Sequence, residues 1–173
     1  MRHFAFALAL LASPLTAQEA ALEGPMTLDR LSQIVAALDP DARVQGTVME
    51  LTIDDVPVLL ITDPANDRMR AMVPIRSADG LEPDELMRLM QANFDSALDA
   101  RYAVARGRLW GVFIHPLAAL EREQLISALI QTVNVARTYG QTYSGGAAIF
   151  GGGDTQGIYR DLLQELLKRG QEL

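Results

Sequence analysis

The run from Leu109 to Ile114 contains no charged or polar residue, and it limits the possible folds more than any other part of the chain. Alternate residues of a strand point to opposite faces, so Trp110, Val112 and Ile114 share one face, and the residues between them share the other. A strand that is apolar on both faces has to be covered on both. Pro116 ends the strand. The run therefore predicts a sheet covered on each side, either by the chain's own helices or by a second subunit.

Changes in hydrophobic period divide the rest of the chain into elements. Alternation of apolar and polar residues predicts strands, and a spacing of three to four residues predicts helices. The predicted helices cover 28–38, 82–98 and about 117–139, and the predicted strands cover 44–53, 56–62, 69–75, 102–105 and 109–114. This order, α-β-β-β-α-β-β-α, predicts an α+β fold in which helices pack on an antiparallel sheet, followed by a Gly-linked C-terminal helix.

Two of these helices have apolar faces that we expect to be buried. In the second helix the apolar stripe consists of Leu86, Leu89, Met90, Phe94 and Leu98. In the 117–139 helix the apolar face is broad and includes Leu125, Leu129, Val133 and Ala136, with Ile126 and Ile130 beside them; Gln124, Gln131 and Asn134 form the polar side. The breadth of that face favours a homodimer over a monomer.

The two ends of the chain differ in composition from its middle. Residues 1–17 have a basic start, an apolar run and small residues, an order typical of a cleavable signal peptide. The apolar run is too short to span a membrane. We expect an α+β domain at 18–143, a Gly-rich linker at 144–153 and an amphipathic tail helix at 154–173. The tail helix has three possible positions: on its own domain, on a partner subunit or on a membrane surface. A periplasmic or secreted protein is the expected result.

Missing residue types exclude most chemistries. The chain has no cysteine, so no disulfide and no thiolate metal site can form. His115 is the only histidine beyond residue 3, and Lys168 is the only lysine. Acidic residues outnumber basic ones by 22 to 15, which argues against nucleic acid as a partner. Pairs such as Met69 and Met72 are more typical of core packing than of a copper site. We therefore expect no cofactor and no metal.

Three runs carry a resemblance to a known family: LWGVFIHPL at 109–117, LISALIQTVN at 125–134 and TYG at 138–140. Together with the element order they resemble the YbjN domain family, whose fold is similar to that of type III secretion chaperones of the Tir-chaperone type. The resemblance covers residues 27–140. It implies a homodimer that binds protein segments or a regulator of sensory and stress responses, and it implies no catalytic residues. The predicted signal peptide and the Gly-linked tail are departures from the family.

His115 has two interpretations. It ends an apolar strand and precedes a proline, so it either hydrogen-bonds the backbone at this corner or acts as a general base.

A set of arginines also has two interpretations. Arg68, Arg70, Arg76, Arg101, Arg106 and Arg108 lie on the predicted strands and turns. They either form a solvated face that is salt-bridged to nearby acids, or present a basic stripe to an acidic peptide or a phosphate.

The sequence favours a non-enzymatic exported module that binds a protein or peptide client in a chaperone-like or regulatory way. The client would lie on the sheet or in a dimer groove, contacting Arg70, Met72, Arg76, Trp110 and Phe150. One alternative is a cell-envelope hydrolase that uses His115 or a pair of carboxylates. A second alternative is a structural assembly subunit.

Overall fold

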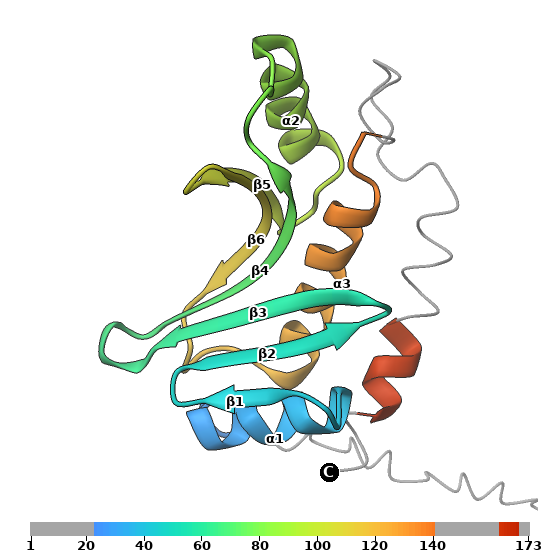
Figure 1. The fold of residues 1–173 in the computed structure, drawn as a ribbon. Coiled ribbons are helices and arrows are strands. Elements are labelled where there is room, and N and C mark those ends of the chain that lie inside the picture. The colour runs from blue at the N-terminus through green and yellow to red at the C-terminus, as the bar shows by residue number, and fades with distance from the viewer. Residues whose placement is uncertain (1–22, 141–162, 170–173) are drawn as a thin grey trace, which may run out of the picture.

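The protein is described here by a computed structural model, which covers residues 23–140 and 163–169 (Figure 1). A six-stranded antiparallel sheet with strand order β1-β2-β3-β4-β6-β5 forms its centre. The elements are α1 (Leu28–Leu38), β1 (Arg43–Gln45), β2 (Val48–Ile53), β3 (Val56–Asp63), a short 3-10 turn (Pro64–Asn66), β4 (Arg68–Ser77), α2 (Pro83–Asp95), β5 (Arg101–Ala105), β6 (Arg108–His115) and α3 (Arg122–Arg137). The predicted α+β class with its antiparallel sheet and packed helices is confirmed.

Two predicted elements have different bounds in the structure. The predicted strand at 44–53 is divided into β1 and β2, because Gly46 has a φ of +59° and turns the chain there. The predicted helix at 117–139 begins only at Arg122. Its start is fixed by a capping box, in which the side chains of Glu121 and Gln124 each bond the other's backbone N–H.

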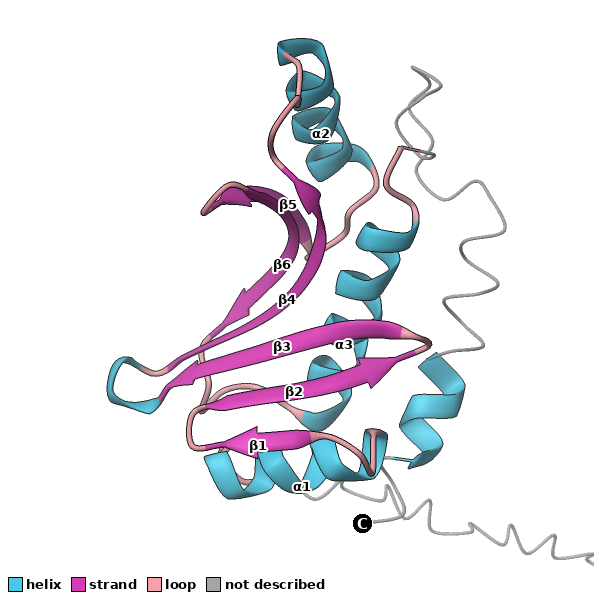
Figure 2. Cartoon of the chain, viewed as in Figure 1, coloured by secondary structure: helices cyan, strands magenta, loops and turns pink. Residues whose placement is uncertain are grey.

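All the described helices pack on one face of the sheet (Figure 2), which we call the covered face. In this view α3 passes behind the strands, and no helix crosses in front of β2 and β3. Side chains of α1 and α3 pack against alternate residues of the strands, including Met49, Leu60, Met69, Ala71 and Phe113. The sequence leaves open whether helices or a second subunit cover each face of the sheet. In the structure, the described helices cover one face only.

The closest approach between helix and sheet lies at Gly111 in β6. A Cβ placed on Gly111 would lie 3.1 Å from the carbonyl oxygen of Thr132 and 3.4 Å from a methyl carbon of Val135, both in α3. Such contacts are tighter than an ordinary van der Waals separation. The glycine therefore allows α3 to lie directly against β6.

Contacts within the chain itself explain why the apolar face of α3 is broad. Gln131, predicted on the polar side, is buried, and its Oε1 accepts hydrogen bonds from the backbone N–H groups of Asp99 (2.9 Å) and Ala100 (3.3 Å). The apolar side chains of α3, including Leu125, Ile126, Ile130 and Val133, are themselves buried in the core. The breadth of this helix therefore gives no support to a homodimer.

Residues 163–169 form a helix that docks on the same domain. Leu166 is buried in the core with residues of α1 and α3, and the guanidinium of Arg169 donates to the carbonyl oxygen of Leu38 at the end of α1 (3.3 Å). Of the three positions considered for the predicted tail helix, this part takes the first. The predicted signal peptide and linker lie outside the described residues. Within those residues no helix is both long and apolar enough to cross a lipid bilayer.

Candidate functional site

The face of the sheet opposite the helices, which we call the open face, is not covered by any described element. Strand alternation places residues of β2, β3, β4 and β6 on this face between the buried residues of the core. Leu59 is half-buried between the buried residues Val58 and Leu60, and Met72 is half-buried between Ala71 and Val73. The helices therefore account for only one of the two apolar faces that the sequence predicts.

A continuous group of apolar side chains crosses the open face, and we call it the apolar patch. Its centre is a row of direct cross-strand neighbours in which Leu59 opposes Met72 and Met72 opposes Val112. Side chains directly opposite each other on adjacent strands are in contact range. The patch comprises Leu59, Ile61, Met72, Pro74, Trp110, Val112 and Ile114. Ile114 is 55% exposed, so the patch reaches solvent at its edge as well as its centre.

A groove of about 770 Å³ lies over one part of this patch. Its apolar lining includes Pro57, Leu59, Pro74 and Trp110, and its polar lining comes from Asp39, Asp41, Arg43, Glu50, Thr52 and Arg108. An apolar floor with charged groups around it is typical of a surface that binds another molecule.

Trp110 is held in place at this groove. Its indole Nε1 donates to the carbonyl oxygen of Ala105 (3.1 Å), and the guanidinium carbon of Arg108 lies 5.7 Å from the centre of its ring. That distance is within the range of a cation–π contact. A fixed aromatic ring loses little conformational entropy when a partner packs on it.

The arginines predicted to lie in a salt-bridged face are mostly not salt-bridged. Among the described residues, Arg76 is the only one of the six with a carboxylate partner, Glu85 at 3.9 Å. Arg68 and Arg101 donate only to backbone carbonyls, and Arg108 stacks on Trp110. Within the described residues, the salt-bridged interpretation is therefore supported at Arg76 alone.

The structure brings together three of the predicted partner-binding residues and separates a fourth. Arg70, Met72 and Trp110 lie on the open face. Arg76 does not, because a bulge between Pro74 and Arg76 shifts the register, so that Arg76 opposes the buried Leu109.

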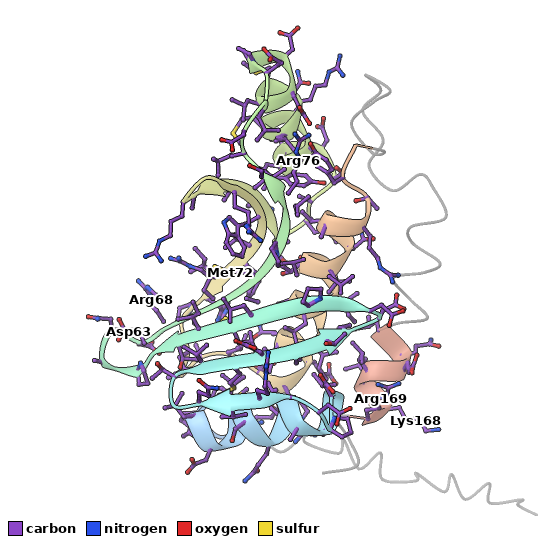
Figure 3. All side chains as sticks on the ribbon, in the orientation of Figure 1. Asp63, Arg68, Met72, Arg76, Lys168 and Arg169 are labelled. Carbon is purple, nitrogen blue, oxygen red and sulfur yellow. The ribbon has the colours of Figure 1, made fainter. Side chains whose placement is uncertain are left out.

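On the covered side, Arg76 contacts residues just after α3 and just before α2. Its guanidinium contacts the Tyr139 hydroxyl (3.2 Å) and donates to the carbonyl oxygen of Asp79 (3.3 Å). Figure 3 shows Arg76 at the α2 end of β4, with Arg68 at the opposite end. Phe150 lies outside the described residues.

His115 contacts the backbone at this corner, as the first of its two interpretations predicts. Its Nδ1 lies 2.8 Å from the carbonyl oxygen of Pro116, and its ring stacks on Phe113 at 5.9 Å between centroids. A second groove of about 630 Å³ passes this residue and is also lined by Asp99 and Ser127. Among the described residues His115 makes no hydrogen bond to a carboxylate or hydroxyl, and no group of three or more potential metal ligands occurs there.

The apolar stripe predicted to be buried in α2 is instead largely exposed. Leu89 and Ala92 face the sheet, whereas Met87, Met90 and Phe94 are 61%, 54% and 83% exposed. Leu86, at 37%, and Leu98, at 55%, are exposed as well. The predicted burial is wrong because α2 projects from the end of the sheet and contacts it mainly through β5 (Figure 1). We call Leu86, Met87, Met90 and Phe94 the α2 stripe.

The fold is similar to three solved structures. A chain in the ExsC–ExsE complex matches with a TM-score of 0.53 and 15% identity, over 69% of this chain and 97% of that chain. A chain in the HopA1–SchA chaperone–effector complex gives 0.50 and 11%, over 66% and 98%. The complex of the Yersinia pestis type III secretion chaperone SycH with a YscM2 fragment gives 0.51 and 19%, over 65% and 98%.

Sequence comparison is less informative. No protein-family model and no curated protein sequence matches the chain, so the resemblance to the YbjN family stays a prediction. The structural matches nevertheless span nearly the whole length of each similar chain. The described domain therefore has the fold found in type III secretion chaperones.

Proposed function

We propose that the chain is a non-enzymatic protein-binding module that holds a segment of a client protein on its open face in a chaperone-like way. The observation that carries the proposal is the apolar patch, a continuous group of apolar side chains on a sheet face that no described element covers. Large exposed apolar patches on a folded protein are typical of binding surfaces. Support also comes from the similar folds, which occur in complexes with ExsE, with HopA1 and with a YscM2 fragment.

A panning experiment tests the proposal. Short random peptides displayed on phage are selected on the full chain and counter-selected on the Met72→Asp variant, which places a charge in the centre of the patch. We expect to select peptides that bind the wild type and do not bind the Met72→Asp variant. The Phe94→Asp variant, altered in the α2 stripe, is the matched control and should retain the selected peptides. Selection of no peptide, or of peptides that bind all three proteins equally, would contradict the proposal.

We also propose that the chain forms a homodimer through the α2 stripe. The exposed side chains Leu86, Met90 and Phe94 follow one another at four-residue spacing, so they lie on one side of the helix with Met87 beside them. An uncharged apolar stripe can pack against its own copy about a two-fold axis without opposing like charges. Light scattering should give a dimer for the wild type and a monomer for Phe94→Asp. A wild-type monomer, or a dimer that persists in the variant, would contradict the dimer interface.

We place the protein outside the cytoplasm as part of the same proposal, and we regard it as a distant relative of YbjN domains. The support is the composition of residues 1–17 for the location, and the runs at 109–117, 125–134 and 138–140 for the relationship. Fractionation of cells that express the full chain tests the location: a shortened protein in the periplasm or medium is expected, and a full-length cytoplasmic protein would contradict it.

A further inference from the structure

Charge is distributed on the open face in a way that the total charge does not predict. The chain has a net charge of −7. The strands β4 and β6 nevertheless place three arginines, Arg68, Arg70 and Arg108, on the face that carries the apolar patch. Arg101 in β5 alternates onto the same face, but its guanidinium donates to the carbonyl oxygens of Leu98 and Ala100 and lines the second groove. Arg70 opposes Ile114 across the sheet, and Arg101 opposes Val112. Arg70 therefore lies directly beside the patch, and Arg108 lies two residues before Trp110 in β6.

Among the described residues, no carboxylate forms an ion pair with Arg68 or Arg70. Arg70 opposes Ile61 on one side and Ile114 on the other, and neither neighbour is acidic. Arg68 does oppose an acid, Asp63, whose hydrogen bonds keep it ionised without joining it to Arg68. Asp63 accepts hydrogen bonds from the side-chain amide of Asn66 (2.7 Å) and from the backbone N–H of Asn66 (3.2 Å). The Asn66 amide is also the main cause that holds the pKa of Asp63 below its usual range. Figure 3 shows both Asp63 and Arg68 at the β3–β4 turn.

Apart from Asp63, the acids near this face lie at its other end and have partners within the chain. Glu50 forms an ion pair with Arg43 across β1 and β2. Asp39 accepts hydrogen bonds from the backbone N–H groups of Asp41 (2.9 Å) and Thr52 (2.7 Å). Charge on the open face therefore changes from balanced or acidic over β1 and β2 to basic over β4, β6 and β5.

We propose that the open face selects protein segments that carry Asp or Glu beside apolar side chains, with the acids placed over the β4–β6–β5 half. This inference rests on the proposed function and names the class of partner. Guanidinium groups bind carboxylates through charge-assisted hydrogen bonds that are stronger than those between neutral groups. The apolar side chains of the segment would pack on the apolar patch between these contacts.

The acidic total charge does not prevent this selection. At physiological ionic strength the Debye length is about 8 Å, so exposed charges farther away than that are largely screened. The nearest charges, which are the arginines, then determine which segment is preferred. Total charge alone predicts a basic client, so the two arguments give opposite signs.

Trp110 provides a direct readout because it is the only tryptophan in the chain and lies on the patch. Three versions of one peptide selected on the wild type are synthesised without tryptophan: the selected sequence, the same sequence with each acid replaced by its amide, and the same sequence with each acid replaced by lysine. Each is titrated into the full chain while Trp110 fluorescence is followed, at low and at high salt.

We expect the selected peptides to be enriched in Asp and Glu over the unselected library, and the acidic version to bind most tightly. The double variant Arg68→Gln, Arg70→Gln should bind it about three- to tenfold more weakly, since each exposed ion pair contributes about 0.2 to 1 kcal/mol. The matched variant Arg88→Gln, Lys168→Gln removes the same charge away from the open face and should bind as the wild type does. Salt should weaken only the acidic version.

The outcomes separate this inference from the proposed function. Equal binding of the three versions, or preference for the lysine version, would overturn the charge selection and leave the protein-binding role intact. Absence of binding by every selected peptide would overturn both. A change of oligomeric state in Met72→Asp would mean that a second copy occupies the open face, and would also overturn the inference.

Discussion

The two faces of the sheet carry neighbouring residues of similar character in very different surroundings. Leu60 and Leu59 are adjacent in β3, yet Leu60 is fully buried under the helices, and Leu59 is half-buried on the open face. Gly111 and Val112 differ in the same way in β6. Burial on the covered face contributes to folding, whereas apolar area on the open face remains available for a partner. Changes on the first face should therefore affect stability, and changes on the second should affect binding.

The largest expected effect comes from Leu60→Ala. Removing a fully buried leucine side chain leaves a cavity and lowers the free energy of unfolding by about 2–5 kcal/mol. Leu59→Ala removes the same atoms from the open face and should cost less than about 1 kcal/mol, while it weakens peptide binding. Urea denaturation of both variants gives the comparison. Equal losses of stability would show that the open face is covered in solution.

A smaller effect is expected for Gly111→Ala. The added methyl group would lie 3.1 Å from the Thr132 carbonyl oxygen, so α3 has to move by a few tenths of an ångström. Such overpacking costs about 1–3 kcal/mol. Val112→Ala, on the opposite face one residue later, is the control and should leave stability nearly unchanged. Thermal denaturation followed by circular dichroism measures both, and a stable Gly111→Ala protein would show that the helix can shift freely.

Gln131→Met tests the polar contact that fastens the loop before β5 to α3. The variant keeps a similar shape but removes the acceptor for the N–H groups of Asp99 and Ala100, at an expected cost of about 1–3 kcal/mol. Gln91→Met, at an exposed position of α2, should be close to neutral. Hydrogen exchange of the Asp99 and Ala100 amides gives the local readout. Unchanged protection of those amides would contradict this role for Gln131.

The sequence predicts the covered face better than the open one, for a physical reason. Periodicity shows that a face is apolar, but it does not show what covers that face. The α2 stripe has the same helical spacing whether it is buried or exposed, so its exposure depends on how far α2 projects beyond the sheet. Trp110 and Val112 do lie half-buried on a second apolar face, and of the two coverings that the sequence leaves open, helices are absent from that face in the described residues.

Arg76 shows a different limit. Alternation from Arg70 and Met72 predicts that Arg76 shares their face, and the bulge after Pro74 reverses this. A single extra residue in a strand moves every later side chain to the other face. Proline lacks a backbone N–H and is often found at bulges, so Pro74 is a local signal, but it does not specify where the register shifts.

The smallest expected effect concerns the N-terminus of α3, the helix that covers the sheet. Glu23 accepts a hydrogen bond from the backbone N–H of Arg122 (2.9 Å) and forms an ion pair with Arg30. The Arg122 N–H is the main cause that holds the pKa of Glu23 below its usual 4.5. Because the folded pKa is lowered, the carboxylate stabilises the fold above the unfolded value, and this contribution is lost as the pH falls through the folded pKa.

Glu23→Gln should therefore be less stable than the wild type at neutral pH, and the difference should close as the pH falls below about 4.5. Arg30→Gln should keep most of the pH dependence, because the backbone N–H of Arg122 remains and the positive end of the helix dipole still favours the charged carboxylate. Urea denaturation of the three proteins across acidic pH measures these differences. A gap that persists at low pH would show that Glu23 acts through the shape of its side chain rather than through its charge, and the fastening of α3 over the covered face would then not depend on pH.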